Sequence, residues 1–244
     1  MVFPSEIPPQ PPTTFSHRVA VANIATPCFL IGHPDPFVLS IMNDGARKAG
    51  RIEFGAIGGG ALITQAGCEE LRTIAPTAFE VHDDGVQLDA RMTFQVPSED
   101  QIPQILNAFL RAVLEWARDS DSRKIELDIT REFIEELVDD DPAILSMAQL
   151  ASIRTRLIGW KYGTIRQSNR GGLRVLTTPM YLCHEVVFED EGVLNALLRD
   201  PFGRVKRVSL EELATTNGGR CEGRTKDGHV LFTNLFEPGY IRLL

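Results

Sequence analysis

Residues 131–137 read REFIEEL, and this short stretch decides both the expected fold and the expected chemistry. On an α-helix, at about 100° per residue, Glu132, Glu135 and Glu136 share one face. The apolar residues fall on the other side of such a helix and can enter a core: Phe133, Ile134 and Leu137. The pattern therefore predicts a helix over residues 130–138 with one acidic and one apolar side.

The acidic side of this helix has two interpretations. Like charges three and four residues apart destabilise a helix by a few tenths of a kcal/mol per pair, and so short a helix is marginal in water. A divalent cation with a preference for oxygen ligands, Mg²⁺, Mn²⁺ or Ca²⁺, would offset that repulsion. The simpler interpretation is a glutamate-rich face that water solvates, which is common on protein surfaces.

Strands are expected on both sides of this helix. Runs of apolar residues bounded by turn signals predict strands at residues 19–24, 37–43, 61–66, 157–165, 173–178, 180–188 and 206–209, with a small β meander within residues 80–95. Helical spacing of apolar residues predicts further helices at 98–119 and 193–199. The fold class is therefore α+β, or a mixed α/β fold in three layers.

Composition is typical of a globular protein, with 43% hydrophobic and 24% charged residues among 244. We expect one domain over residues 18–244, preceded by an extended, proline-rich arm at residues 1–17. The arm lacks the basic start and apolar middle of a signal peptide, and no apolar run approaches the roughly 20 residues of a membrane span. A cytoplasmic protein is expected, with no membrane partner. The net charge of −8 disfavours general nucleic-acid binding.

The four cysteines are scattered and form no Cys-x-x-Cys pair: Cys28, Cys68, Cys183 and Cys221. A zinc site or a disulfide framework is therefore not expected. They are interpreted as small buried apolar residues.

The sequence R-E-x-x-E-E at residues 131–136, with apolar Phe133 and Leu137, resembles the end of the Nudix box, G-x₅-E-x₇-R-E-U-x-E-E-x-G-U, where U is aliphatic. As in that family, strands and a glycine turn, here Gly58, Gly59 and Gly60, precede the helix. The resemblance covers residues 18–213. It implies a Nudix-like α/β/α sandwich with a mixed sheet, and Mg²⁺- or Mn²⁺-dependent hydrolysis of a nucleoside diphosphate-linked substrate, a nucleotide or dinucleotide-type molecule.

The chain departs from the family pattern in three places. Residues of about 61–129, a β meander and a helix, form an insertion between the glycine turn and the acidic helix. Arg123 stands where the family has its upstream glutamate, and Glu126 is close but out of register. Val138-Asp139 replaces the final glycine. Such insertions resemble those of divergent Nudix domains associated with bacterial nucleotide-signalling and antiviral systems, including the SMODS-associated group.

The resemblance also implies roles for the helix and the glycine turn. Glu132, Glu135 and Glu136 would be catalytic residues that supply metal ligands, one of them acting as the base toward water, and Arg131 would hold them through an ion pair. Gly59 would offer its backbone carbonyl to the metal, and Gly58 and Gly60 would shape the loop next to the substrate. A plain tight turn is the other interpretation of the glycines.

Two further groups are candidates. Glu185 lies in an apolar strand and would complete the metal site, unless it is an exposed edge residue. No acidic residue occurs between Pro142 and His184, whereas six basic residues do: Arg154, Arg156, Lys161, Arg166, Arg170 and Arg174. Such a local excess of positive charge suggests an anionic partner, with Arg154, Lys161, Arg166 and Arg174 binding substrate phosphates; side chains that merely face solvent are the alternative.

Two other functions remain open. The missing upstream glutamate favours a Nudix-fold sensor that binds a nucleotide without cleaving it. The 98–119 helix allows a scaffold that pairs with other proteins; its apolar stripe packs either on the chain's own core or on a second subunit of a homodimer.

Overall fold

The structure is a computed structural model of the chain. It describes residues 15–25, 37–42, 54–74, 88–89, 91–96, 99–139, 142–162, 166–170, 173–209, 221–224, 230–233 and 242–243.

Two long strands form the middle of a mixed sheet. Strand β1 (Phe15–Ala25) runs parallel to β10 (Leu173–Phe188), with Val21 opposite Met180 and Ala25 opposite His184. Shorter strands, all antiparallel to their neighbours, extend the sheet: β4 (Gly58–Gly60) and β7 (Arg91–Val96) on β1, β8 (Ile153–Tyr162) and β9 (Arg166–Arg170) on β10, and β14 (Arg242–Leu243) on β8.

Antiparallel pairing makes up the other sheets. The largest is the three-stranded sheet of β2 (Phe37–Met42), β3 (Phe54–Ala56) and β11 (Val205–Ser209), in which β2 is central. Two two-stranded sheets complete the set: β5 (Leu62–Ile63) with β6 (Leu88–Asp89), and β12 (Cys221–Arg224) with β13 (Val230–Thr233). The expected α+β class with a mixed sheet is thus confirmed.

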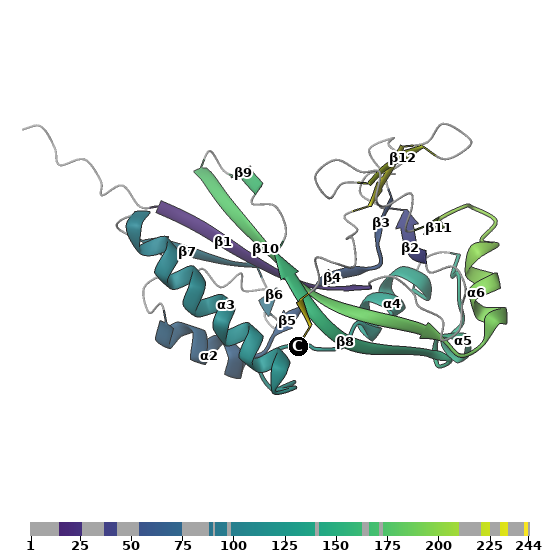
Figure 1. Cartoon of the computed structure of the whole chain (residues 1–244), viewed down its shortest axis with the longest axis horizontal. Helices are drawn as coiled ribbons and strands as arrows, with labels where there is room; N and C mark the ends of the chain where they lie inside the picture. The colour runs from purple at the N-terminus through teal and green to yellow at the C-terminus, as the bar shows by residue number, and fades with distance from the viewer. Residues whose placement is uncertain are drawn as a thin grey trace, which may run out of the picture.

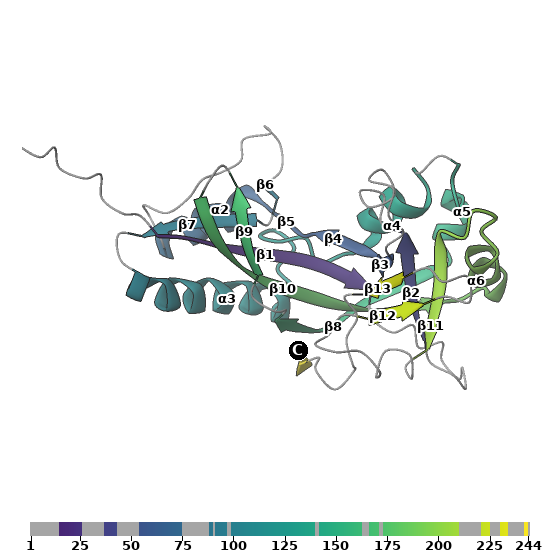
Figure 2. The same cartoon turned by 90° about the horizontal axis from the view of Figure 1, so that it is seen from above.

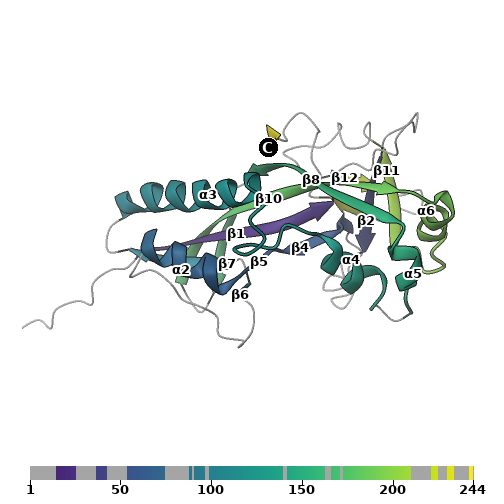
Figure 3. The same cartoon turned by 90° about the horizontal axis from the view of Figure 1, so that it is seen from below.

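The helices gather at the two ends of the mixed sheet (Figures 1, 2 and 3). At one end lie α2 (Gln65–Ile74), the short 3-10 helix η1 (Glu99–Gln101) and α3 (Ile102–Arg118). At the other end lie α4 (Thr130–Leu137), α5 (Met147–Leu150) and α6 (Glu191–Leu198). The helices expected at 130–138 and 193–199 are therefore confirmed, and the one at 98–119 begins as η1.

Each end has its own apolar core. In one, Val21 and Leu182 of the central strands pack with Phe109, Val113 and other side chains of α2 and α3. In the other, residues of α4, α6, β2 and β11 surround Val186 of β10. Strands β1 and β10 contribute to both cores, so they join the two ends into one folded unit.

The 61–129 segment, expected as an insertion, is part of this unit. Its strand β7 pairs with β1, and its helix α3 buries Phe109, Val113 and Trp116 in the first core. The apolar stripe of α3 therefore packs on the chain's own sheet, which is the first of the two alternatives that the sequence left open. The stripe gives no support to a homodimer.

Two stretches differ from the sequence expectation. Residues 61–66, predicted as a strand, contain only β5 and then the start of α2. The sequence did not predict helix α2, because Gly67 is a poor helix former. Glycine is needed at position 67 because a side chain there would meet the backbone oxygen of Lys124. The strands predicted at 173–178 and 180–188 are one strand, β10. Its Pro179 is paired with Ala20 of β1, and on the other side of β10 it lies where the neighbouring strand changes from β9 to β8.

Three smaller expectations have mixed outcomes. The proline-rich arm expected at 1–17 overlaps β1, which begins at Phe15; residues 1–14 lie outside the described part of the chain. The meander within residues 80–95 is described only from residue 88. Cys68 and Cys183 are buried free thiols, as expected, whereas Cys28 and the side chain of Cys221 lie outside the described part. None of the described helices combines the length and apolar character that a bilayer crossing requires.

Candidate functional site

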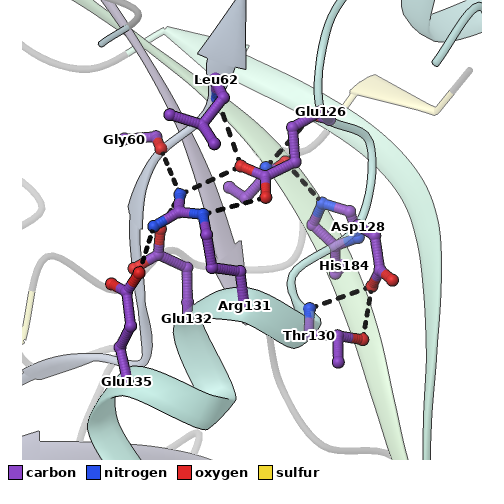
Figure 4. Close-up of polar contacts among 10 residues, drawn as sticks. Gly60, Leu62, Glu126, Asp128, Thr130, Arg131, Glu132, Glu135 and His184 are labelled. Carbon is purple, nitrogen blue, oxygen red and sulfur yellow. Dashed lines mark hydrogen bonds and ion pairs between the residues drawn. The ribbon is translucent and has the colours of Figure 1, made fainter. Parts of the chain in front are cut away.

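Helix α4 is anchored at its start by the side chain of Asp128. One oxygen of that carboxylate, Oδ1, accepts hydrogen bonds from the backbone N–H (3.0 Å) and the hydroxyl (2.8 Å) of Thr130 (Figure 4). This satisfies a backbone donor that the first helical turn would leave unpaired. Phe133 and Leu137 are buried in the core beneath, so the opposite side of α4 turns toward β4.

Arg131 is the centre of the polar contacts around α4 (Figure 4). Its Nε and Nη2 atoms each donate to the carboxylate of Glu126 at 3.0 Å. The guanidinium also pairs with Glu132, and its Nη1 lies 2.8 Å from Oε1 of Glu135. Nη2 donates to the backbone oxygen of Gly60 as well, at 2.7 Å. These hydrogen bonds, above all that to Glu126, raise the pKa of Arg131, so the side chain stays charged.

Glu126 holds Arg131 from a segment outside the helix. Besides the two bonds from the guanidinium, its Oε2 accepts from the backbone N–H of Leu62 at 3.2 Å. The backbone N–H of Glu126 in turn donates to the oxygen of Leu62 at 2.7 Å. These two hydrogen bonds attach the segment before α4 to β5. They also fix the position of the Glu126 carboxylate, which accepts the hydrogen bonds from Arg131.

Glu132 is buried against the glycine strand. Only 4% of the residue is exposed, and its carboxylate lies over Gly59 so closely that a Cβ at position 59 would overlap both carboxylate oxygens. Burial raises the pKa of Glu132, and the charge of Arg131 opposes that shift. The side chain is therefore a buried carboxylate with one cationic neighbour.

Glu136 has a poorer environment. Its carboxylate receives a hydrogen bond from the backbone N–H of Gly58, yet its buried Oε2 has no hydrogen-bond partner among the described residues. Burial, together with the negative charge of Glu132, raises the pKa of Glu136 to about 8. A buried oxygen that lacks a donor is destabilising, and a proton or a cation would relieve it.

The three glycines form a strand, which corrects the expected turn. Gly58, Gly59 and Gly60 pair with Ile24, Asn23 and Ala22 of β1, respectively. The residues suit this place for steric reasons: Gly58 has a φ of 149°, and a side chain at Gly59 would displace Glu132. Glycine here allows an acidic helix to approach a strand closely.

The acidic side of α4 is not a uniformly solvated face. Glu135 is exposed, but Glu132 is buried and Glu136 is largely buried. Within the described residues, no group of three or more His, Cys, Asp or Glu side chains is placed to hold a metal ion. Arg131 forms an ion pair with one oxygen of Glu132 and with one oxygen of Glu135.

Several predicted site residues lie elsewhere. Glu185 of β10 pairs with Arg156 of β8 at 2.6 Å, and Arg154 of β8 pairs at 3.0 Å with Glu189, which directly follows β10. Since neighbouring strand residues alternate, these side chains point away from the face of His184, which is the face of α4. Lys161 lies near Cys183, and nothing is described of the side chains of Arg166 and Arg174. The structure thus brings together the glutamates, Arg131 and the glycines, but neither Glu185 nor Arg154.

Three polar residues of this region were missed or undervalued in the sequence. Asn23 and His184 are both buried, and Nε2 of His184 lies 2.9 Å from Oδ1 of Asn23. Asp128 anchors α4, as described above. A signal existed for the first two, because each is a polar residue in a largely apolar strand, Val19–Ala25 and Met180–Phe188.

Comparison of the chain with protein-family models, curated proteins and solved structures finds no match.

Proposed function

We propose that the chain binds Mg²⁺ or Mn²⁺ between α4 and β4 and hydrolyses a phosphoric anhydride in a nucleoside diphosphate-linked substrate. The observation that supports this most is the buried Oε2 of Glu136, which has no hydrogen-bond partner in the described part of the chain. It lies next to a second buried carboxylate, that of Glu132, whose negative charge raises the pKa of Glu136 further. Two largely buried acids close together, with one oxygen that lacks a donor among the described residues, are an arrangement that a divalent cation stabilises.

The side chains present fit such an ion. The donors are oxygen atoms only, which suits Mg²⁺ or Mn²⁺ and disfavours softer metals. Mg²⁺ is usually held by one or two carboxylates, several waters and substrate phosphates, so Glu132 and Glu136 suffice as its protein ligands. A bound ion of this kind neutralises charge on phosphate oxygens and makes a bound water more acidic.

The chain's own residues have separable tasks in this proposal. Glu132 and Glu136 hold the ion, while Gly59 leaves the space in which the Glu132 carboxylate lies. Arg131 keeps Glu132 in place and, through Glu126, ties the helix to β5. The substrate class follows from the likeness of residues 131–136 to the Nudix box. Arg154 and Glu185 have no part, because each is engaged in an ion pair on the other face of the sheet.

A turnover assay tests the proposal. The full chain, with Mg²⁺ or Mn²⁺, is incubated with a panel of nucleoside triphosphates, dinucleotides and nucleoside diphosphate conjugates, and products are separated by chromatography. Glu136→Gln should abolish cation-dependent release of phosphate or nucleoside monophosphate, whereas Glu115→Gln, on the exposed side of α3, should not. Equal turnover in Glu136→Gln and the unchanged chain would contradict the site.

A second candidate, a sensor that binds nucleotide without cleaving it, is favoured by the ion pairs of Arg131. The guanidinium takes an oxygen from both Glu132 and Glu135, which leaves fewer carboxylate oxygens for catalysis. Calorimetric titration with the same nucleotides separates the two functions. Binding without product at any cation concentration supports the sensor.

A further inference from the structure

Two buried polar side chains on the central strands lie next to the segment that precedes α4. Asn23 of β1 has no exposed surface, and His184 of β10 is 1% exposed. A polar group in the interior is costly unless it is hydrogen-bonded, and both positions lie among apolar neighbours. Their contacts should therefore show what they hold in place.

The two side chains form a connected pair with a defined direction. Oδ1 of Asn23 lies 2.9 Å from Nε2 of His184. The amide nitrogen of Asn23, Nδ2, donates to the backbone oxygen of Glu126 at 3.2 Å. Because that backbone oxygen can only accept, the amide nitrogen must face it, so Oδ1 faces the histidine. Oδ1 is itself only an acceptor, so Nε2 of His184 must carry a proton.

Glu126 carries this anchoring forward to the acidic helix. Its backbone is held by Asn23 on one side and by Leu62 on the other. Its carboxylate in turn receives two bonds from Arg131, the residue that also contacts Glu132. A chain of contacts thus runs from β10 through β1 and Glu126 to the acids that face β4.

We propose that Asn23 and His184 are positioning residues, which fix Glu126 and through it the orientation of Arg131 and Glu132. Neither side chain contacts the proposed ion. Their effect on Mg²⁺ or Mn²⁺ binding rests on the proposed function, but their effect on the placement of the segment before α4 does not. The two effects are therefore measured separately.

The first measurement is amide hydrogen exchange of the full chain, which needs no ligand. His184→Leu, and the double variant Asn23→Leu/His184→Leu, should speed exchange in peptides covering residues 124–131 by about five- to tenfold, the factor for loss of one hydrogen bond. In the double variant both partners become apolar, so exchange in α3 should stay near that of the unchanged chain. His184→Gln, which keeps an N–H donor near the place of Nε2, should restore slow exchange.

Ser40→Ala is the matched control, because Ser40 is also fully buried in a strand, and its hydroxyl has no partner among the described residues. It should leave residues 124–131 unchanged. Equal acceleration in α3 and in residues 124–131 would reduce the pair to a general role in stability and overturn the proposal. So would a His184→Gln variant that exchanges as fast as His184→Leu. If His184→Leu does not fold, the comparison of the double variant with His184→Gln still tests the positioning role of the pair.

The second measurement is Mn²⁺ binding, followed by the paramagnetic resonance of the free ion. Affinity should fall about fivefold in the double variant and recover in His184→Gln, in parallel with exchange. If the unchanged chain binds no Mn²⁺, the proposed function fails while the exchange result still stands. Binding that is unchanged in a chain with loosened residues 124–131 would overturn the link to the site.

Discussion

The carboxylate of Glu132 lies against the backbone of Gly59, with no room between them for even one methyl group. Helix α4 therefore contacts strand β4 through the side chain of Glu132, which lies against the backbone of Gly59. This contact places a buried acid beside the strand, and it depends on the absence of a side chain at position 59.

Gly59→Ala should displace Glu132 and weaken both the fold and cation binding. The new Cβ would overlap the carboxylate, and overpacking of this kind costs about 1 to 3 kcal/mol of unfolding free energy. Gly55→Ala is the control, because a Cβ there meets nothing within 4 Å. Urea unfolding of both variants, with and without Mg²⁺, checks this; equal stability of the two would contradict the described contact.

Arg131→Ala should destabilise the chain in a way that added Mg²⁺ partly reverses. Removal of the guanidinium leaves the acids of Glu126 and Glu132 without their cationic partner, at a cost on the order of 2 kcal/mol. Arg118→Ala breaks only an exposed pair with Asp119 and should change little. The measurement is the thermal midpoint of each variant; a midpoint for Arg131→Ala that matches Arg118→Ala would disprove the central role of Arg131.

Glu136 should make stability depend on pH. The fold raises the pKa of this carboxyl from about 4.5 to about 8, so the folded chain binds the proton more tightly than the unfolded one. The resulting stabilisation is fully present below pH 4.5 and is lost as the pH rises toward 8. Glu136→Gln removes this dependence, so the variant should gain stability relative to the unchanged chain between pH 5 and 9. If the denaturant midpoints of the variant and the unchanged chain differ by the same amount at every pH in this range, the pH dependence does not come from Glu136.

Cation affinity should rise with pH over the same interval. A metal ion binds the deprotonated carboxylate, so it must displace the proton that Glu136 holds below pH 8. Affinity for Mn²⁺ should increase by about tenfold per pH unit between pH 6 and 7 and level off above pH 8. Titration calorimetry in buffers of different ionisation enthalpy would detect the released proton. A flat profile would place the ion away from Glu136.

The sequence allowed the acidic helix to be predicted almost to the residue, because the alternation of acidic and apolar residues in REFIEEL is a local property. It also indicated that Arg131, Glu132 and the glycines belong together. Their actual arrangement could not be inferred, because it depends on β1: Gly58–Gly60 becomes a strand only through pairing with Ala22–Ile24.

Other features of the site also depend on pairing between distant segments. Glu185 seemed a suitable ligand because an acid in an apolar strand needs a partner, but which face it occupies is set by its register with Arg156. Asn23 and His184 are 161 residues apart, and no local pattern predicts their contact. Long-range pairing, not local propensity, decides these features of the site.

The parallel pairing of β1 with β10 has a consequence for synthesis on the ribosome. His17 finds its neighbour Leu176 only after roughly 160 further residues have been made, which takes about ten to thirty seconds at ordinary elongation rates. Until then, one edge of β1 has no strand to pair with and is open to other chains. Nascent chains of this protein should therefore need shielding early in translation, and slow codons before residue 188 would prolong that exposed state.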